Sequence, residues 1–213
     1  MQLLLPLQTM RAAANFFSWV LQPLLMPLYG TAIFLTLPFY AFRLMPDAVK
    51  WYVIICNSLF TFLLPVIMIL LMLKLGIVKT VELENREDRR YPLLVTVIFH
   101  AANYYFLSRV PLPSLYYLFL LSGIFSLLLT LIVSKYWKIS MHMTGIGGLC
   151  GSLLLCAIVW PIDVRWMLAG LFLAAGIVGS SRLILNAHTP AQVGAGFGAG
   201  LLPQLAILLI YLR

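Results

Sequence analysis

Long apolar runs, each close to 20 residues, recur along almost the whole sequence, and they constrain the fold more than any other feature. A helix of about 20 apolar residues is long enough to cross the hydrocarbon core of a bilayer. Hydrophobic residues make up 63% of the 213 residues and charged residues only 9%, a composition far more apolar than that of soluble domains. The sequence therefore predicts an all-α, polytopic membrane helix bundle, with residues 1–213 forming a single integral membrane domain.

Breaks at charged residues and at clusters of proline and glycine divide the chain into six or seven predicted transmembrane helices. The predicted spans lie near 12–38, 50–75, 92–108, 112–134, 142–160, 165–180 and 190–212. Gln22, Pro23 and Pro27 interrupt the first span, which is therefore expected to be broken or re-entrant. No basic residue precedes Arg11 and no small-residue cleavage site is present, which argues against a removable signal peptide.

Polar residues gather in three loops, at 79–92, 134–148 and 181–192. Two crossings separate each of these loops from the next, so all three are expected on the same face of the membrane. The loops of the opposite face, at 108–114 and 161–165, are short. This concentration of polarity predicts a single site that is assembled from three loops.

The first loop carries charges of both signs: Lys79, Arg86, Arg89 and Arg90 alternate with Glu82, Glu84, Glu87 and Asp88. Such a run is typical of a solvated linker whose charges pair with one another. Lys79 and Arg86 are also suited to holding one oxyanion together, because lysine supplies a point charge and arginine a planar fork of donors. Both interpretations are open at this stage.

The second loop contains Ser140 and His142, followed by the glycine-rich run TGIGG at 144–148. A histidine at a membrane edge is a candidate for proton transfer, although it is more often a tolerated interfacial residue. The glycine run lacks the P-loop lysine, so close helix packing is its expected role.

The third loop places Ser181 and Arg182 ahead of His188, and Gln192 lies one helical turn beyond the histidine. An arginine at a membrane edge is a functional candidate, because burying its charge is costly. Of the three loops, the third is therefore the one most strongly predicted to be functional.

In chain order, these residues resemble the three motifs of the phosphatidic acid phosphatase type 2 superfamily, whose patterns are KxxxxxxRP, PSGH and SRxxxxxHxxxD. The matching positions are Lys79 with Arg86, Ser140 with His142, and Ser181-Arg182 with His188. The resemblance covers roughly residues 79–192, and its third motif is the most specific part.

The resemblance implies a membrane phosphatase that hydrolyses a lipid phosphomonoester or diphosphate. His188 would attack phosphorus and form a phosphohistidine, while His142 would donate a proton to the departing oxygen. Gln192 would orient His188, as the third catalytic residue. The phosphate-binding residues would be Lys79, Arg86, Ser140, Ser181 and Arg182. No cofactor and no metal is implied.

The first two motifs depart from the family pattern. Glu87 follows Arg86 where the family has proline, and RRYP comes slightly later, so Arg86, Arg89 and Arg90 are alternative phosphate ligands. In the second motif, Met141 replaces the glycine that lets the backbone approach a phosphate.

Gln192 stands where the family has aspartate. A neutral amide can accept the Nδ1 hydrogen of His188, but it can also flip and does not stabilise an imidazolium. A catalytically weakened or inactive relative that binds phospholipid headgroups is therefore the alternative function. A transporter or channel is a third hypothesis, for which the chain offers few deep charges.

The expected partners are a lipid phosphate substrate and membrane lipids, and a homo-oligomer is an open alternative. The net charge of +8 is attributed to basic membrane margins that meet anionic lipid, not to nucleic-acid binding. The resemblance implies the bacterial cytoplasmic (inner) membrane. The distribution of basic residues leaves the orientation of the site open.

The remaining features have structural interpretations. GAGFGAG at 194–200 contains two overlapping GxxxG spacings, which predict the close approach of another helix. His100 is expected to be a hydrogen-bonded interior residue. The cysteines are expected to be small buried hydrophobes and four tryptophans to form an aromatic belt: Cys56, Cys150, Cys156, Trp51, Trp137, Trp160 and Trp166.

Overall fold

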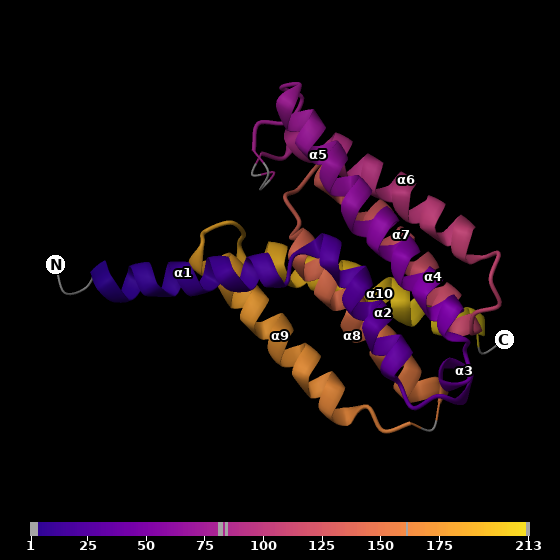
Figure 1. Ribbon diagram of the computed structural model, residues 1–213. Coiled ribbons are helices and arrows are strands. Elements are labelled where there is room, and N and C mark those ends of the chain that lie inside the picture. Colours follow the sequence, from indigo (N-terminus) through magenta and orange to yellow (C-terminus); the bar gives the residue numbers. More distant parts are fainter. Residues whose placement is uncertain (1–3, 81–82, 84, 161, 212–213) are drawn as a thin grey trace.

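The computed structural model describes residues 4–80, 83, 85–160 and 162–211, and the side chains of 8–80, 83, 85–160 and 162–207. Helices and their connections account for all of the described residues, without a strand among them, so the predicted all-α class is confirmed. Figure 1 shows a bundle in which most long helices run side by side, while α1 projects away from the others. The molecule is thus a layered assembly of helices around a buried centre.

The α-helices have the following bounds: α1 Leu4–Val20, α2 Met26–Thr36, α3 Tyr40–Arg43, α4 Asp47–Asn57, α5 Leu64–Lys74, α6 Arg90–Leu107, α7 Ser114–Ser134, α8 Met141–Val159, α9 Arg165–Ile184 and α10 Pro190–Tyr211. Short 3₁₀ helices lie at Pro23–Leu25 and Glu87–Arg89. A π-helical segment, Ser58–Leu63, joins α4 to α5 without a break.

The first apolar run is broken at the position that the sequence indicates. α1 ends at Val20, and Pro23 begins a 3₁₀ turn before α2 starts. Proline has no backbone N–H to donate and cannot continue the preceding helix. The break lets α1 turn away from α2 and pack against α9 (Figure 1).

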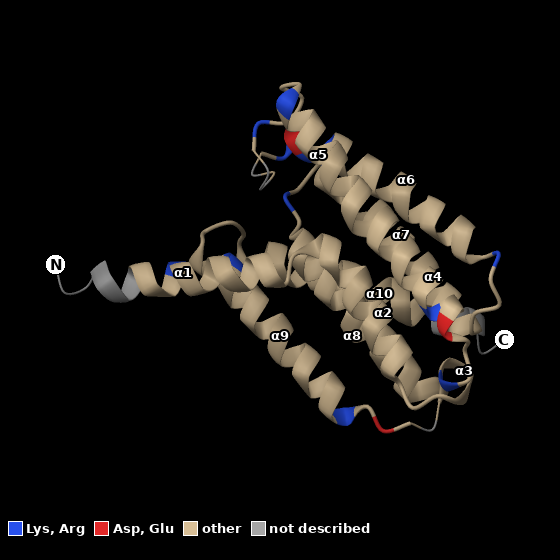
Figure 2. Ribbon diagram, viewed as in Figure 1, with Lys and Arg blue, Asp and Glu red and all other residues tan. Residues whose placement is uncertain are grey.

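Among the residues that the structure describes, five helical segments are long and apolar enough to cross a membrane: Gln8–Thr36, Asp47–Lys74, Ser114–Ser134, Met141–Val159 and Arg165–Ile184. They coincide with five of the predicted spans. The predicted spans at 92–108 and 190–212 correspond to α6 and α10, which are not among these five and which carry polar residues such as Asn103 and Gln204. Figure 2 shows that most Lys, Arg, Asp and Glu lie near helix ends or in the connections, apart from Arg11 within α1, and that the middle of the bundle is uncharged.

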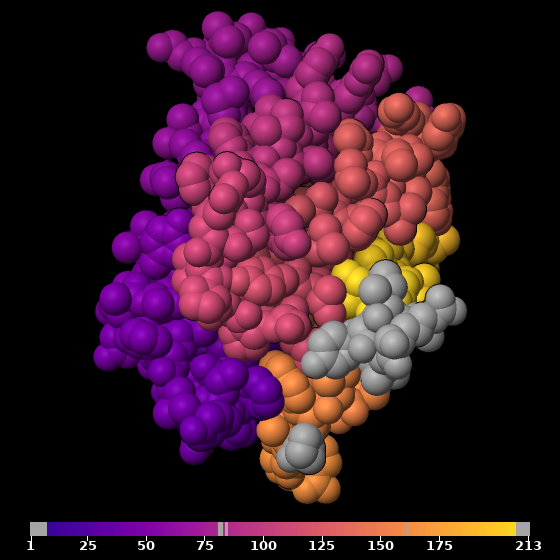
Figure 3. Space-filling view, turned by 90° about the vertical axis from the view of Figure 1, so that its right-hand side faces the viewer, coloured from indigo at the N-terminus to yellow at the C-terminus, as the bar shows by residue number. Residues whose placement is uncertain are grey.

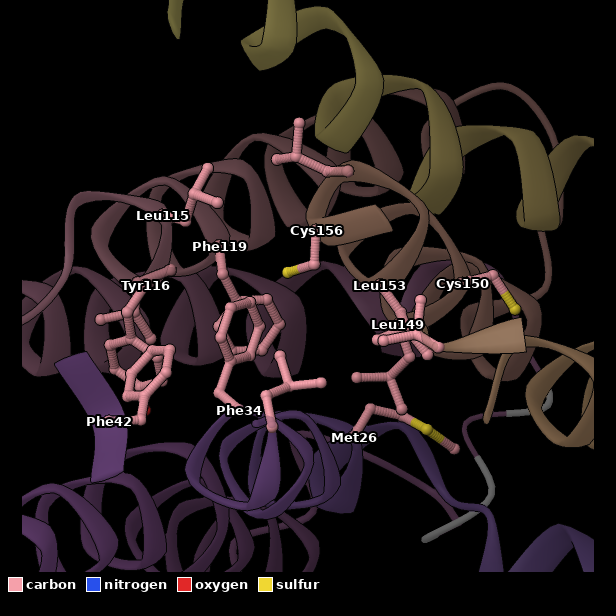
Figure 4. Packing of buried hydrophobic residues seen from close by; sticks show 14 of the residues in the cluster. Met26, Phe34, Phe42, Leu115, Tyr116, Phe119, Leu149, Cys150, Leu153 and Cys156 are labelled. Atoms are coloured by element: carbon pink, nitrogen blue, oxygen red, sulfur yellow. The ribbon is translucent and has the colours of Figure 1, made fainter. Parts of the chain in front are cut away.

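α8 lies at the centre of the bundle. About two thirds of its apolar window is buried (67%), against 22–33% in the other four segments. Around it, Phe34 of α2 and Phe119 of α7 approach to 5.1 Å between ring centroids. Figure 4 shows these rings facing the side chains of α8, including Leu149 and Leu153. Cys150 and Cys156 also lie in this core and are free thiols, as expected.

One of the predicted belt tryptophans belongs to the core instead. Trp160 is 8% exposed and stacks on Phe39 with ring centroids 3.7 Å apart, so the belt prediction is wrong for this residue. Its position directly after α8 explains the difference, because the end of α8 is covered by the chain around α3. Trp51 and Trp166 are 63% and 86% exposed, as a belt requires.

Glycines allow α8 and α10 to pack with their backbones in contact. A Cβ on Gly200 would overlap the Thr144 carbonyl, and one on Gly147 would overlap the carbonyl of Phe197. Gly194 and Gly198, in contrast, have no neighbour within 4 Å of an added Cβ. The Gly196–Gly200 spacing therefore makes the helix contact, and the overlapping Gly194–Gly198 spacing does not.

The three polar loops meet at one end of the bundle (Figure 1). Hydrogen bonds join them: the Ser140 amide donates to the Gln192 carbonyl at 3.3 Å, and Arg89 donates to the Ile139 carbonyl at 2.8 Å. The loops at 108–114 and around Asp163 lie toward the other end. The shared location that was predicted from the alternation of crossings is thus observed.

Candidate functional site

The connection from α9 to α10 holds Arg182 and His188 by local backbone geometry. α9 ends with Asn186 in the left-handed conformation (φ +54°). The amides of Asn186 and Ala187 donate to the carbonyls of Leu183 and Arg182 at 2.9 and 3.1 Å. This is a Schellman termination, which asparagine tolerates better than most residues. It turns the chain so that His188 comes just before the capping residue of α10, Thr189.

Thr189 and Gln192 form a reciprocal capping box at the start of α10. The backbone N–H of Thr189 donates to Gln192 Oε1 at 3.1 Å, and the backbone N–H of Gln192 donates to Thr189 Oγ1 at 3.4 Å. In such a box, the third helical residue returns a hydrogen bond to the capping residue. The Thr189 N–H thereby identifies which end of the Gln192 amide is the oxygen, and it opposes a flip of that amide.

His188 is held by two acceptors. Its Nδ1 lies 3.2 Å from the Lys138 carbonyl oxygen and 3.3 Å from Gln192 Oε1. Both partners only accept hydrogen bonds, so Nδ1 carries the proton and Nε2 keeps its lone pair. His188 is 8% exposed. The arrangement thus fixes one tautomer of a buried imidazole.

The start of α8 adds the second histidine. Ser140 precedes α8 and is fully buried, and its hydroxyl has no hydrogen-bond partner among the described residues. The His142 Nε2 lies 3.1 Å from the Ser18 carbonyl, to which it donates. Since Ser140 also bonds to Gln192, the N-termini of α8 and α10 lie side by side. Two helix N-termini together form an electropositive location that favours an anion.

Arg89 is the first-loop cation that reaches these residues. It is 2% exposed, its Nε donates to the Leu83 carbonyl at 2.8 Å, and its Nη1 donates to the Ile139 carbonyl at 2.8 Å. Ile139 immediately precedes Ser140, so the guanidinium is fixed beside the start of α8. Of the three arginines that the sequence left as alternatives, Arg89 is the one brought to the histidines.

The other first-loop candidates lie outside this cluster. Lys79, Arg86 and Arg90 are exposed, and Arg86 Nη1 donates to the Tyr136 carbonyl at 3.0 Å. Lys79 and Arg86 line a small separate hollow together with Asp88. The structure therefore does not bring the predicted Lys79–Arg86 pair to the two histidines.

Asp88 of the first loop and Ser181 form hydrogen bonds that do not involve the two histidines. Asp88 accepts from the Asn85 amide at 3.3 Å, while Glu82 and Glu84 lie outside the described residues. The Ser181 hydroxyl donates to the Ile177 carbonyl at 2.7 Å, one turn back in α9. That hydroxyl is used within its own helix.

Arg182 joins the cluster from α9. Its Nη1 lies 3.3 Å from Ser18 Oγ, so Ser18 contacts both Arg182 and His142. The charges of Arg182 and Arg89 both act on the His142 ring. We use the term phosphate cluster, after the ligand that the motif resemblance implies, for the four residues His142, His188, Arg89 and Arg182.

The electrostatics of the phosphate cluster keep His188 neutral and Arg89 cationic at neutral pH. Burial, followed by the charges of Arg89, Arg182 and Lys138, lowers the pKa of His188 to about 4. Burial and the charge of Arg182 lower the pKa of Arg89 to about 10. A neutral imidazole with a free lone pair is a nucleophile or base, and two guanidiniums suit an anion with several oxygens.

A cavity of about 530 Å³ extends from His142 and Arg182 into the bundle, and neither His188 nor Arg89 lines it. Ser18, His142 and Arg182 line its outer end, and apolar side chains such as Val66 and Leu93 line its walls. His100 also lines it, and its Nδ1 lies 2.8 Å from the Thr96 carbonyl, as expected of a hydrogen-bonded interior residue. The described residues contain no group of three or more His, Cys, Asp or Glu that could hold a metal ion.

Comparison of the chain with protein-family models, with curated proteins and with solved structures found no match.

Sequence reasoning did not find three parts of the site. Ser18 lies in the first apolar run, where only its polarity within an oily segment marked it. Thr189 begins a T-x-x-Q sequence that is recognisable as a capping box. The Lys138 carbonyl is a backbone group, for which a sequence holds no signal.

Proposed function

We propose that this protein is a membrane phosphatase that hydrolyses a lipid phosphomonoester or diphosphate through a phosphohistidine. The observation that carries the proposal is the phosphate cluster itself: two histidines and two arginines from three distant loops, placed at the N-termini of α8 and α10. His142 and Arg182 of this cluster line a cavity. Anion binding and nucleophilic attack need this combination of groups. The likeness to the phosphatidic acid phosphatase type 2 motifs supports the same function.

In the first step, His188 Nε2 attacks phosphorus. The N–P bond forms as the P–O bond to the lipid breaks, and His142, in its doubly protonated form, gives a ring proton to the departing oxygen and becomes neutral. In the second step His142 takes a proton from water, the water oxygen forms the new P–O bond, and the N–P bond breaks. His188 is released neutral and inorganic phosphate leaves.

Arg89 and Arg182 hold the phosphoryl oxygens in both steps. Their charges offset the negative charge of the transferring group, which is the main catalytic requirement in phosphoryl transfer. The Ser140 hydroxyl lies beside them with an unused donor. In this assignment Arg89 replaces Lys79 and Arg86 as the first-loop ligand.

Gln192 orients His188 but adds no charge. The capping box and the Lys138 carbonyl select the Nδ1–H tautomer, which is one of the two tasks of the family's aspartate. The other task, stabilising a positive imidazole, is left unfilled by Gln192. The site therefore works with a weakly basic nucleophile.

A lipid substrate is favoured over a soluble phosphate ester because the phosphate cluster opens into a cavity inside an apolar bundle. We propose that α6 and α10 also cross the membrane. α6 exposes apolar side chains, among them Ile98 (56%) and Tyr105 (55%), and forms the centre of the face in Figure 3. The proposed location is the bacterial cytoplasmic membrane.

The direct test is phosphate release by purified protein in detergent, with phosphatidic acid and an isoprenyl diphosphate as substrates. His188→Ala is expected to abolish release, and Arg89→Ala to lower kcat by about 10²–10³, as for loss of one preorganised donor. Arg86→Ala serves as the matched control and is expected to retain activity. Wild-type protein quenched in alkali should carry a phosphoryl group that acid removes, as phosphohistidine does. Undiminished release by His188→Ala would refute the proposed role.

A second function keeps the binding site without the chemistry. The neutral Gln192 and the bulky Met141 favour a relative that binds phospholipid headgroups without turnover. Binding of phosphatidic acid that depends on Arg89 and Arg182, with no phosphate released at any pH, would support this function over the first.

A further inference from the structure

The inner end of the cavity is polar, although it lies within the apolar part of the bundle. Asn103 of α6 and Gln204 of α10 line it and are each only 1% exposed. The Asn103 Oδ1 and the Gln204 Oε1 have no hydrogen-bond donor among the described residues. A buried amide oxygen without a donor is costly, so each oxygen requires a donor that the chain does not supply there.

A hydrogen-bond network fixes the orientation of Asn103. Its Nδ2 donates to Asn57 Oδ1 at 3.0 Å, and Asn57 Nδ2 lies 2.9 Å from the Tyr116 hydroxyl. That hydroxyl is also 2.9 Å from Thr31 Oγ1. This network joins α6 to α4, α7 and α2. It fixes the nitrogen of the Asn103 amide and leaves the oxygen without a donor.

The backbone next to this network is irregular in a way that is typical of binding sites. The π-helical segment Ser58–Leu63 begins directly after Asn57, and Thr61 within it lines the cavity. Single π turns inside α-helices are rare and occur frequently at functional sites. This second observation points to the same end of the cavity.

The position of the two amides corresponds to the middle of a lipid chain. Asn103 in α6 and Gln204 in α10 each lie about 20 Å from the first residue of their helix, at 1.5 Å per residue. Both helices begin at the phosphate cluster. A lipid chain that runs inward from the phosphate first passes apolar side chains, including Val66 and Leu93, and then meets the amides of Asn103 and Gln204. Plain acyl and isoprenyl chains present only C–H groups at that point.

We propose that the inner end of the cavity recognises a lipid whose hydrocarbon chain carries a mid-chain hydroxyl group. The hydroxyl donates to Asn103 Oδ1 or to Gln204 Oε1 and satisfies an oxygen that is otherwise unpaired. The proposal rests on the proposed function for the direction of the chain, because the phosphate cluster is taken to hold the headgroup. Recognition of the chain itself does not require hydrolysis.

The test compares lipids that differ only in this hydroxyl. Dioleoyl and diricinoleoyl forms of phosphatidic acid and of phosphatidylcholine compete for binding to the purified full-length protein in detergent. The diricinoleoyl phosphatidic acid is expected to bind at least about fivefold more tightly, which corresponds to one net hydrogen bond of about 1 kcal/mol. Equal binding of oleoyl and ricinoleoyl chains, as expected if water alone fills the cavity, would overturn the proposal.

The phosphatidylcholine pair separates this proposal from the phosphatase. A ricinoleoyl preference with both headgroups shows that a bilayer lipid also occupies the site, and a preference with phosphatidic acid alone shows that the hydroxylated lipid enters headgroup first. Both results support chain recognition even if no phosphate is released. Phosphate release without any chain preference leaves the phosphatase standing and removes the chain site.

Two variants of similar size test the two amides. Gln204→Met and Asn103→Leu remove the oxygens, and each is expected to reduce the ricinoleoyl preference. Gln204→Met is the decisive variant, because Asn103→Leu also leaves Asn57 without its partner and can disturb folding. Ser152→Ala is the matched control, since Ser152 is buried in α8 (3% exposed) and does not line the cavity. A full preference in folded Gln204→Met and Asn103→Leu proteins would contradict the assignment.

Discussion

At the scale of single residues, the arrangement around Gln192 explains how an imidazole can be positioned without a carboxylate. The Thr189 amide and the His188 ring both donate to Gln192 Oε1, so the glutamine oxygen has a fixed place. A free glutamine would lack this constraint, because its amide can flip. The glutamine that the sequence marks as a departure from the family pattern is therefore built into the start of α10.

Removal of this oxygen is expected to slow the reaction without weakening binding. Gln192→Leu leaves His188 with only the Lys138 carbonyl as acceptor, and kcat should fall about tenfold, equivalent to one hydrogen bond of about 1.4 kcal/mol. KM should change little, since Gln192 does not contact the phosphate. Steady-state phosphate release measures both constants. The control is Ala191→Leu at an exposed position, for which both constants should match wild type.

The pH profile follows from the lowered pKa of His188. The nucleophile must be neutral, so on the acid side of the profile kcat/KM should fall as the pH drops through about 4, the pKa of the buried ring beside Arg89 and Arg182. Gln192→Glu keeps the capping box and adds a negative charge, which raises the pKa of His188. The acid limb of the variant should therefore lie at higher pH than that of wild type. Coincident acid limbs would show that His188 is not the group that titrates.

At the scale of helices, the contact between α8 and α10 sets the distance between the two histidines. His142 lies in the first turn of α8, and His188 lies two residues before the first residue of α10. Because Gly200 and Gly147 allow backbone contact between these helices, the imidazoles are brought together by packing that lies deeper in the bundle.

A single methyl group on this contact should separate the helices. Gly200→Ala places a Cβ against the Thr144 carbonyl, and overpacking of this kind costs about 1–3 kcal/mol. The midpoint of thermal unfolding in detergent should fall, and phosphate release should fall with it. Gly198→Ala is the matched control, because nothing lies within 4 Å of its added Cβ. Equal effects of the two substitutions would argue against the packing account.

At the scale of the molecule, the sequence predicted the helical class and the gathering of three loops, but not all of the site. Apolar runs and the alternation of crossings depend only on local composition, and so both could be inferred. Arg89 could not be chosen over Arg86, because an irregular loop has no periodicity that sets which side chain points inward. Ser18 and Trp160 were missed since their places depend on how α1 and the α3 region fold back on α9 and α8.

Gly123 provides a way to test whether the lipid chain enters the cavity. Gly123 of α7 lines the cavity and has nothing within 4 Å of an added Cβ, so Gly123→Leu narrows the space without a backbone clash. The KM for phosphatidic acid should rise, while hydrolysis of the small soluble ester p-nitrophenyl phosphate should remain at the wild-type rate. Gly170→Leu, at an exposed position of α9 with open space around it, is the control and should alter neither. An unchanged KM for the lipid in Gly123→Leu would mean that the chain lies outside the bundle, and that only the phosphate enters the site.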